Sequence, residues 1–257
     1  MSGKDLLTIG GKNFKSRLMV GTGRHKSNQE MVDSIRSSEA EIITVAIGRI
    51  DLNNSEQKSI LDFFDWNKYT LLPNTAGSKT AKEAIYTAEL ARELTGTSWI
   101  KLEVIPDSKY LLPDPVQTFE AAEYLVKNKF TVLPYINADP VLAKKLEDIG
   151  CATVMPLGSS IGSGNGIHTL EEIKIIIEQS NVPVVVDAGL AVPSDAAIAM
   201  EIGADCVLVN TAIAQARDPL LMGNAFKLGV EAGRKAYLAG RIPKIDHGKM
   251  SSPDSGI

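Results

Sequence analysis

The amino-acid sequence predicts a single (β/α)8 TIM barrel, because two patterns alternate along its 257 residues. Eight apolar segments rich in β-branched residues recur along the chain, and segments with apolar residues at helical spacing lie between them. Strand and helix that alternate eight times indicate a parallel sheet closed into a barrel. An open doubly wound sheet is the alternative, but the segment after the first strand, GTGRHKSN, lacks the third glycine of a dinucleotide-binding motif.

The predicted elements follow one another in a regular order. A short segment at 6–14 comes first and is expected to form a hairpin that plugs the bottom of the barrel. The predicted strands then lie at residues 17–23, 40–48, 69–77, 98–105, 130–136, 152–160, 182–189 and 205–210. The clearest helix-like segments, several with a Ser, Thr or Asp cap or a final Gly, are 78–94, 115–128, 139–150, 169–179 and 194–203.

The length and composition of the chain indicate one globular domain. A chain of this size buries a large core, and α/β barrels of similar length are commonly a single domain. We therefore expect residues 1–240 to form the barrel. Residues 241–257 are rich in polar and helix-breaking residues, which predicts a mobile C-terminal tail.

Charge and hydropathy exclude several classes of protein. The hydrophobic fraction of 44% and the charged fraction of 23% are those of an ordinary soluble protein. A net charge of -4 argues against a nucleic-acid-binding protein, which would normally be basic. No segment has the pattern of a secretory signal or a membrane span, so we expect a cytoplasmic protein with no membrane partner. Cys151 and Cys206 lie in or beside apolar segments without metal-ligand spacing, which predicts buried, reduced thiols.

The fourth predicted strand, TSWIKLEVIPD, carries two charged residues where a buried strand should be apolar. Side chains alternate along a strand, so the apolar residues at 100, 102 and 104 share one face, and Lys101 and Glu103 share the other. We expect the apolar face to pack on helices and the charged pair to point into the barrel. A buried ion pair that only fixes the core is the alternative, but such pairs add little net stability, which favours a functional site.

An interior lysine is suited to imine chemistry. Desolvation lowers the pKa of an amine, so that a neutral fraction attacks a ketone or aldehyde to form a Schiff base. The carboxylate of Glu103 favours the ammonium instead, yet it is useful for moving protons as an imine forms and rearranges. Asp187 ends the seventh predicted strand. We expect it to face Lys101 as a second acid or base rather than to cap the next helix, which begins near Ser194.

Three loops after the last three predicted strands together indicate a phosphate site. Residues 157–167 are rich in Gly and Ser, so their backbone N–H groups can approach an anion closely. Residues 187–197 lead through small residues to a helix N-terminus, and residues 210–219 offer the side chains of Asn210 and Thr211. Loops near the seventh and eighth strands are the usual phosphate site of such barrels.

The residues alone support an imine-forming lyase, isomerase or synthase that acts on a phosphorylated sugar or keto compound. An imine-forming aldolase or phosphosugar isomerase remains an alternative, because the fold does not choose between these reactions. A second alternative is a non-catalytic phosphate-binding barrel in which Lys101 and Glu103 form a core ion pair.

Motifs spread over nearly the whole chain carry a family resemblance. LTIGGKNFKSRLMVGTG, LLPNTAG, WIKLEVIPD, VLPYINADPVLAKKLEDIGC, MPLGSSIGSG, VPVVVDAG and GADCVLVNTAIA follow one another in an order that resembles the bacterial and plastid thiazole synthase family of thiamine biosynthesis. The resemblance implies a (β/α)8 barrel that binds 1-deoxy-D-xylulose 5-phosphate. It implies that Lys101 is the Schiff-base lysine and that Glu103 and Asp187 are the acid/base carboxylates. The positions that match the family's substrate-binding residues are Gly162, Ala188, Gly189, Asn210 and Thr211.

The resemblance also implies a reaction and its partners. Lys101 would form an imine with the ketone of the pentulose phosphate, and proton transfers would move the carbonyl along the chain. The C-terminal Gly-Gly thiocarboxylate of a sulfur-carrier protein would deliver sulfur, and addition of dehydroglycine with loss of water would close the thiazole ring. Dehydroglycine would come from a separate enzyme, either a glycine oxidase or a radical tyrosine lyase. No cofactor or metal is implied for this chain, and a homotetramer would fit the family.

Two positions depart from the family pattern. Ser160 stands where many relatives have proline, which should loosen its loop but leaves the neighbouring glycines intact. Gly48 precedes Arg49 where a basic pair is more usual. If the family uses the side chain at position 48 to hold phosphate or the carrier protein, this departure puts that contact in question.

Overall fold

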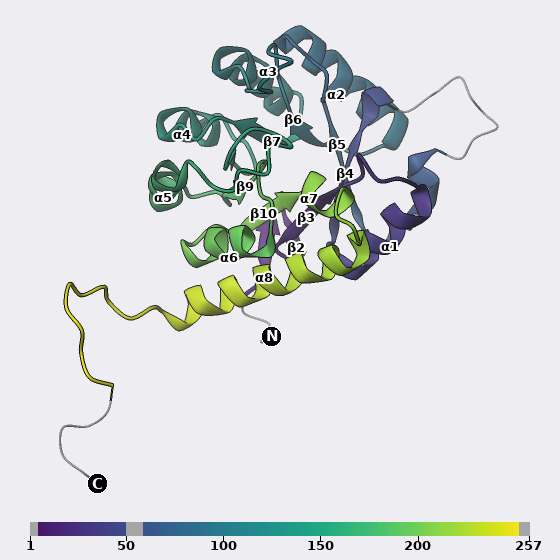
Figure 1. Cartoon of the computed structure of the whole chain (residues 1–257). Coiled ribbons are helices and arrows are strands. Elements are labelled where there is room, and N and C mark those ends of the chain that lie inside the picture. Colours follow the sequence, from purple (N-terminus) through teal and green to yellow (C-terminus); the bar gives the residue numbers. More distant parts are fainter. Residues whose placement is uncertain (1–4, 50–58, 252–257) are drawn as a thin grey trace.

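The computed structural model describes residues 5–49 and 59–251, and it confirms the predicted barrel of parallel strands (Figure 1). The eight barrel strands all fall inside the predicted segments: β3 (Leu18–Gly21), β4 (Ile42–Ala46), β5 (Thr70–Asn74), β6 (Trp99–Leu102), β7 (Thr131–Ile136), β8 (Met155–Pro156), β9 (Val185–Val186) and β10 (Cys206–Val209). Their order in the sheet is β8-β7-β6-β5-β4-β3-β10-β9. Two parallel bridges, Val154 to Val184 and Leu157 to Asp187, join the ends of this order, so the sheet closes on itself.

Helices surround the barrel and begin at recognisable caps. They are α1 (Asn28–Ser38), α2 (Ala81–Thr95), α3 (Pro115–Lys127), α4 (Pro140–Asp148), α5 (Leu170–Gln179), α6 (Pro193–Glu201), α7 (Thr211–Ala214) and α8 (Pro219–Ala239). The side chains of Thr80, Asp114 and Asp139 accept hydrogen bonds from backbone N–H groups in the first turns of α2, α3 and α4. These caps satisfy donors that a helix start otherwise leaves unpaired, which is why the sequence located these helices within a few residues.

The connection between β4 and β5 departs from the simple alternation of strand and helix. Its described residues form two 3₁₀-helices, η1 (Ile47–Arg49) and η2 (Ile60–Phe63), and no α-helix. The segment after η2 is rich in aromatic residues, and the ring of Phe64 lies 5.6 Å from that of Trp66 and 5.7 Å from that of Tyr69. These rings pack on the outer core beside β3 and β4, so in the described part of the connection aromatic side chains cover the sheet.

The barrel has an outer and an inner apolar layer. In the outer layer, the side chains of Ile100 and Leu102 on β6 pack against alanines of α2 and α3, which allow the helices to lie close to the sheet. The inner layer fills the lumen with side chains from every strand, namely Met19, Ile42, Leu72, Trp99, Leu133, Met155, Val185, Cys206 and Leu208. The two cysteines are buried and unpaired, as predicted.

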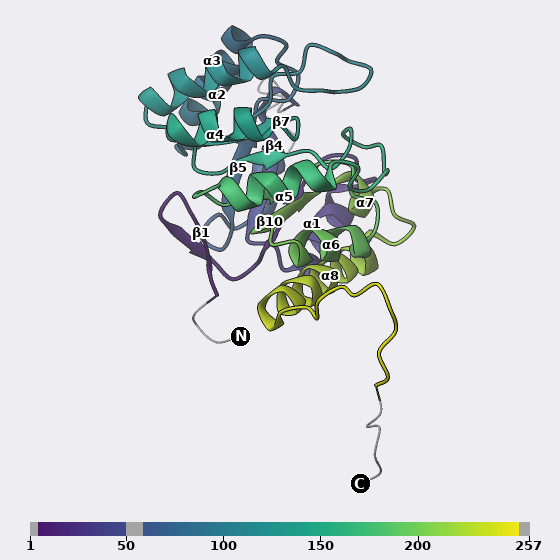
Figure 2. The same cartoon turned by 90° about the vertical axis from the view of Figure 1, so that its left-hand side faces the viewer.

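The predicted N-terminal hairpin is present and closes one end of the lumen. Strands β1 (Leu7–Ile9) and β2 (Lys12–Phe14) pair in antiparallel fashion, and Figure 2 shows them apart from the main sheet. Three of their side chains, Leu7, Ile9 and Phe14, join the inner layer. Each such burial stabilises the fold by roughly 1.5–3 kcal/mol. Because β6 begins at Trp99 and the ring of Phe14 meets that of Trp99, the hairpin closes the end at which the strands begin.

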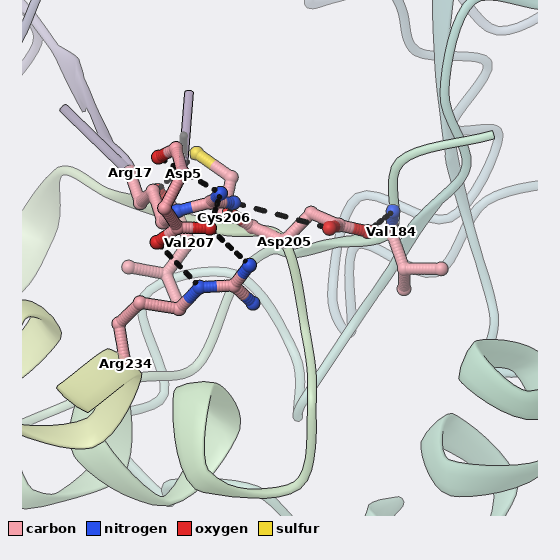
Figure 3. A network of polar contacts seen from close by, with 7 residues as sticks. All are labelled: Asp5, Arg17, Val184, Asp205, Cys206, Val207 and Arg234. Atoms are coloured by element: carbon pink, nitrogen blue, oxygen red, sulfur yellow. Dashed lines mark hydrogen bonds and ion pairs between the residues drawn. The ribbon is translucent and has the colours of Figure 1, made fainter. Parts of the chain in front are cut away.

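Four charged residues, here called the basal ion cluster, tie the start of the chain to the barrel (Figure 3). They are Asp5, Arg17, Asp205 and Arg234. Arg17 donates to the Asp5 carboxylate and to the Asp205 carbonyl, each at 2.8 Å. Arg234 on α8 donates to both oxygens of Asp5 at 2.6 and 3.0 Å. The carboxylate of Asp205 accepts the N–H of Val184 at 2.9 Å, so the cluster connects segments that are far apart in sequence.

The chain leaves the barrel after α8. Residues 241–251 are exposed and form no helix or strand, and Figure 1 shows them extending away from the barrel. The rest of the predicted tail, 252–257, lies outside the described residues, and the mobility of the tail stays a prediction. In the described ranges, each helix is too short or too polar to cross a membrane.

Candidate active site

A cavity of about 1190 Å³ opens at the ends of the barrel strands opposite the hairpin. It is lined by all eight residues predicted from the sequence, which come from the ends of β6, β9 and β10 and from the loop after β8: Lys101, Glu103, Gly162, Asp187, Ala188, Gly189, Asn210 and Thr211. Predicted site residues that lie up to 110 positions apart in sequence therefore share one cavity. Their chemical roles stay predictions.

Lys101 and Glu103 point into the cavity, as strand alternation predicts. Their apolar neighbours on β6 pack outward on α2 and α3, which fixes the opposite face of the strand toward the lumen. Lys101 donates a hydrogen bond from Nζ to Oε1 of Glu103 at 3.0 Å. Both side chains are almost inaccessible to solvent, with exposed fractions of 5% and 7%. The pair therefore lies at the base of the cavity, beneath the space that a ligand would occupy.

Asp187 completes this group, and Lys101, Glu103 and Asp187 are here called the site ion cluster. Oδ2 of Asp187 lies 2.6 Å from Nζ of Lys101, although β6 and β9 are three strands apart. That oxygen has no well-aligned hydrogen-bond donor among the described residues. Helix α6 begins at Pro193, so Asp187 does not cap it, as predicted. The Lys101 amine is thus held between two carboxylates that approach it from different strands.

The charges of the site ion cluster determine its protonation. Burial on its own lowers the pKa of Lys101, but the charges of Asp187 and Glu103 outweigh burial and raise that pKa above its ordinary value. Burial raises the pKa of Asp187, and the Lys101 charge opposes this without reversing it. Of the two opposing effects that the sequence indicated, burial and neighbouring carboxylates, the carboxylates therefore dominate and favour the ammonium form of Lys101. The proton of that ammonium lies beside a carboxylate with raised affinity for it.

Thr75 fixes the backbone that carries Glu103. Its buried hydroxyl donates to the carbonyl of Glu103 at 2.7 Å and accepts the N–H of the same residue at 2.8 Å. The Thr75 N–H also donates to the carbonyl of Lys101 at 3.2 Å. These bonds continue the contact between β5 and β6 beyond the last regular pair, so they position Glu103 after its strand has ended. The sequence offered no signal for this role, because a threonine in a strand-end turn is common.

Tyr135 on β7 contacts the lysine and was missed from the sequence. Nζ of Lys101 lies 5.3 Å from the centre of the Tyr135 ring, a cation–π distance. The Tyr135 hydroxyl donates to the carbonyl of Leu111 at 3.5 Å, and Leu111 adopts a left-handed backbone with φ 56°. Burial raises the pKa of Tyr135 above its ordinary value, so the phenol stays neutral. A tyrosine in an apolar strand is typical of the hydrophobic core, so no sequence pattern distinguished Tyr135 as a site residue.

The loops after β8 and β9 form one connected wall of the cavity. The N–H of Gly158 donates to the carbonyl of Asp187, and the N–H of Gly166 donates to the carbonyl of Gly189. Gly189 has φ 79°, and a Cβ there would lie 1.9 Å from the hydroxyl of Ser159, so only glycine fits. The N–H groups of Gly162 and Gly189 donate no hydrogen bond within the described ranges. Unpaired N–H groups of this kind can bind an anion, and a phosphate site here stays a prediction.

Asn210 supports the neighbouring loop as well as lining the cavity. With its amide nitrogen turned toward the loop after β3, it donates to the carbonyls of Gly21 and Gly23 at 3.2 and 2.8 Å. Gly21 has no room for a side chain, because a Cβ would lie 2.7 Å from Asn210. The amide nitrogen is thus used within the protein. Asn210 and Thr211 both line the cavity, and their contact with a substrate stays a prediction.

The two departures from the family pattern disturb the described structure little. The carbonyl of Ser160 accepts the N–H of Ser163 at 3.1 Å, so its loop still forms a turn. Gly48 is exposed, and among the described residues a Cβ there would meet only the carbonyl oxygen of Ala76, at an ordinary 3.8 Å. Packing against the described residues therefore does not require glycine at position 48.

Sequence comparison finds close relatives over the whole chain. The model of the family described as "Thiazole biosynthesis protein ThiG" matches residues 8–253. A curated thiazole synthase from Prochlorococcus marinus (strain MIT 9301) is 59% identical, and the match covers 98% of this chain and 97% of that protein. A thiazole synthase from Acaryochloris marina (strain MBIC 11017) is 55% identical over 98% of this chain and 94% of its own length.

Solved structures of other proteins share the barrel fold of this chain. A chain of the Amycolatopsis orientalis BexX/CysO complex superposes with a TM-score of 0.84 at 32% identity, covering 94% of this chain and 98% of that one. A 3-hexulose-6-phosphate synthase superposes with a TM-score of 0.56 at 14% identity, over 83% of this chain and 99% of its own. The second likeness shows a common barrel only.

Proposed function

The chain belongs to the thiazole synthase family of thiamine biosynthesis, and from this premise we propose the reaction that its site carries out. The protein condenses 1-deoxy-D-xylulose 5-phosphate, dehydroglycine and the sulfur of a carrier-protein thiocarboxylate into a thiazole phosphate through an imine on Lys101. The observation that carries the proposal is the site ion cluster, in which a buried lysine lies within 3.0 Å of one carboxylate and 2.6 Å of another. The cavity above it is of the size that small-molecule sites have.

Imine formation requires Lys101 to lose a proton first. The short contact with Asp187 provides the acceptor: the ammonium gives one proton to that carboxylate, and the neutral amine attacks the ketone carbon. The nitrogen then loses a second proton to the former carbonyl oxygen. Asp187 returns the first proton to that oxygen, which leaves as water, and a protonated imine remains on Lys101. Charge and atoms balance, because one positive charge is present before and after the step.

Glu103 is the group we assign to proton transfer at the substrate carbons. Once Lys101 is an imine, its positive charge acidifies the adjacent C–H groups, and a carboxylate beside it can remove and return such protons. Thr75 holds the backbone of Glu103 from both its N–H and its carbonyl. That constraint supports a base that must act at a defined position. These transfers move the carbonyl along the sugar chain, so that sulfur and dehydroglycine can add.

The phosphate group of the substrate is assigned to the loops after β8, β9 and β10. The unpaired N–H groups of Gly162 and Gly189 and the side chain of Thr211 line that wall of the cavity. A phosphate there would leave the ketone end of the sugar to reach Lys101.

A sulfur-carrier protein is the proposed macromolecular partner. A chain of the BexX/CysO complex has this fold at 32% identity, and that protein is solved together with a second one, which supports a protein partner here. The thiocarboxylate tail of such a carrier would enter the cavity from its open mouth to reach the substrate on Lys101. A homotetramer remains an expectation from the family resemblance.

Reductive trapping tests the imine. The protein is incubated with 1-deoxy-D-xylulose 5-phosphate, treated with borohydride, digested and examined by peptide mass spectrometry. We expect a reduced adduct on the peptide that contains Lys101 and its loss in Lys101→Ala. Inorganic phosphate added in excess should compete and lower the yield.

Three outcomes would contradict the proposal. An adduct on another lysine would reassign the nucleophile, and no adduct with intact phosphosugar binding would favour a non-catalytic barrel. An adduct that turns over to a sugar product without any sulfur donor would instead favour the aldolase or isomerase alternative.

A further inference from the structure

Two buried polar side chains next to the site ion cluster have no role in the chemistry described so far. Asn74 at the end of β5 is the direct strand partner of Lys101, and partner residues of parallel strands point to the same side of the sheet. Thr44 on β4 pairs with Leu72, which lies in the inner layer, so Thr44 also faces the lumen. Both residues line the cavity, and their exposed fractions are only 9% and 5%.

Asn74 and Thr44 are ordered but retain capacity to donate hydrogen bonds. The side-chain oxygen of Asn74 accepts the N–H of Ala76 at 3.3 Å, and its nitrogen donates to the Thr44 hydroxyl at 3.4 Å. A carboxamide nitrogen carries two hydrogens and a hydroxyl carries one. The second N–H of Asn74 and the hydroxyl hydrogen of Thr44 therefore meet no acceptor in the part of the chain that the structure describes. Two such donors side by side in a cavity wall are suited to an oxygen anion.

Their position in the ring of strands separates them from the phosphate wall. In the sheet order, β5 is four strands from β9 in either direction, so Asn74 lies diametrically opposite the loop that carries Gly189. A phosphosugar that spans from that loop to Lys101 on β6 fills one half of the cavity. The half lined by β4 and β5 is then left for a second, smaller reactant.

We propose that Asn74 and Thr44 form the subsite for the carboxylate of the two-carbon α-imino acid that joins the phosphosugar on Lys101. This inference rests on the proposed function and names the part of the cavity that takes its small nitrogen-bearing substrate. The N–H of Asn74 and the hydroxyl of Thr44 each donate to the carboxylate. The imino carbon is thereby directed toward the neighbouring strand, β6, where the sugar is attached. Lys79, which also lines the cavity in the loop after β5, adds a positive charge on the path of the incoming anion.

Binding of a stable carboxylate tests the subsite separately from turnover. The probe is oxamate, a planar two-carbon carboxylate that bears nitrogen, titrated by calorimetry into protein whose Lys101 carries the borohydride-reduced phosphosugar. We expect Asn74→Ala to weaken oxamate binding at least 10-fold and Thr44→Val to weaken it about 3- to 10-fold. Thr153→Val is the matched control, because Thr153 is buried, lies outside the cavity and has an unpartnered hydroxyl. It should bind oxamate as the wild type does.

The formation of the adduct gives the second measurement. The phosphosugar concentration that gives half-maximal trapping should be the same in wild type, Asn74→Ala and Thr44→Val. Unchanged oxamate binding in Asn74→Ala would overturn the inference. If the phosphosugar concentration for half-maximal trapping changed in that variant while oxamate binding did not, Asn74 and Thr44 would hold the sugar instead. If the wild type forms no adduct, the proposed function fails; the titration of unmodified protein then decides on the subsite alone, with the same expected difference between the variants.

Discussion

The barrel contains two ion clusters, a partly exposed one at the end closed by the hairpin and a buried one at the other end, and they are built differently. The basal ion cluster contains two arginines, and Arg234 donates a bidentate pair of hydrogen bonds to the two carboxylate oxygens of Asp5. Hydrogen bonds from Arg234, with the charges of both arginines, lower the pKa of Asp5 despite partial burial. The site ion cluster uses one lysine between two carboxylates. Burial raises the pKa of Asp187 there, and one of its oxygens lacks an aligned donor within the described ranges.

This difference separates a cluster whose charges are fixed near neutral pH from one in which a proton can be transferred. Guanidinium groups do not lose their proton, and an aspartate with a lowered pKa does not take one up near neutral pH, so the basal ion cluster has one fixed charge state. An ammonium beside a carboxylate with a raised pKa can pass its proton across a contact of 2.6 Å. Whether the protons of a charged cluster can be transferred therefore says more about its role than its location in the barrel does.

Replacement of Lys101 should have the largest effect of any change at either cluster. Lys101→Met removes the nucleophile at similar volume, and we expect thiazole formation to fall about 10⁴-fold or more. The variant also leaves Asp187, whose pKa burial raises, without its cation, so it should be less stable at pH 7 than at pH 5, where that carboxylate protonates more readily. Turnover assays and thermal unfolding at both pH values measure these effects. Activity above one hundredth of wild type would show that the lysine is not the nucleophile.

Replacement of Asp187 should separate activity from stability. Asp187→Asn keeps the shape of the side chain but cannot accept the Lys101 proton, so we expect turnover to fall about 10²- to 10⁴-fold. Its melting temperature should stay equal to that of the wild type or rise, because a carboxylate that burial disfavours is gone. A large loss of stability with normal turnover per folded molecule would assign Asp187 to the scaffold instead.

Replacement of Arg17 should have the opposite pattern. Arg17→Met keeps the apolar stem but breaks the basal ion cluster, and because its partners are partly exposed we expect a loss of about 2 to 3 kcal/mol, or roughly 4 to 12 °C in melting temperature. Turnover per folded molecule should not change, since the cluster lies at the far end of the barrel. Arg17→Lys is the control, and it should recover only part of the stability, because an ammonium cannot fork between two partners.

The smallest effect, and the sharpest comparison, is the sign of the pH dependence at the two aspartates. Asp5 has a lowered pKa, so its stabilisation is present above the unfolded value of about 3.9 and is lost as pH falls through the folded value. Asp187 has a raised pKa, so its contribution is greatest at low pH and is lost as pH rises through the folded value.

Denaturant titrations from pH 3 to pH 7 measure this. The stability advantage of wild type over Asp5→Asn should grow with pH, whereas that over Asp187→Asn should shrink. If the two stability differences between wild type and variant changed with pH in the same direction, the two clusters would not differ in the way described.

Much of this organisation could be predicted from the sequence, for identifiable reasons. Apolar strand segments and helix caps are local signals, so the barrel strands and most helix starts could be read directly. Alternation along one strand was enough to direct Lys101 into the lumen. The positions of Tyr135 and Asn74 beside Lys101 could not be predicted, because an aromatic or an amide in a buried strand looks like ordinary core. Both residues come close to Lys101 only through neighbouring strands, and pairing between strands is not a local property.

Two further features could not be predicted from the sequence: the direction of the pKa shift of Lys101 and the 3₁₀-helices between β4 and β5. The sequence showed two opposing effects on the pKa of Lys101, burial and the charge of Glu103, but the second carboxylate, Asp187, is 86 residues away, so the direction of the shift could not be decided from the strand alone. The segment between β4 and β5 is apolar through aromatic residues rather than through helical spacing, so its 3₁₀ turns had no periodic signal.

The bond between Asp5 and Arg234 also has a consequence for how the protein is made. The two residues are 229 positions apart, so at 5 to 20 residues per second Arg234 leaves the ribosome roughly 10 to 45 seconds after Asp5. During that interval Leu7, Ile9 and Phe14 have no complete barrel to enter, and they remain apolar and exposed on the nascent chain. A chaperone that binds short apolar segments would find the hairpin accessible during that interval.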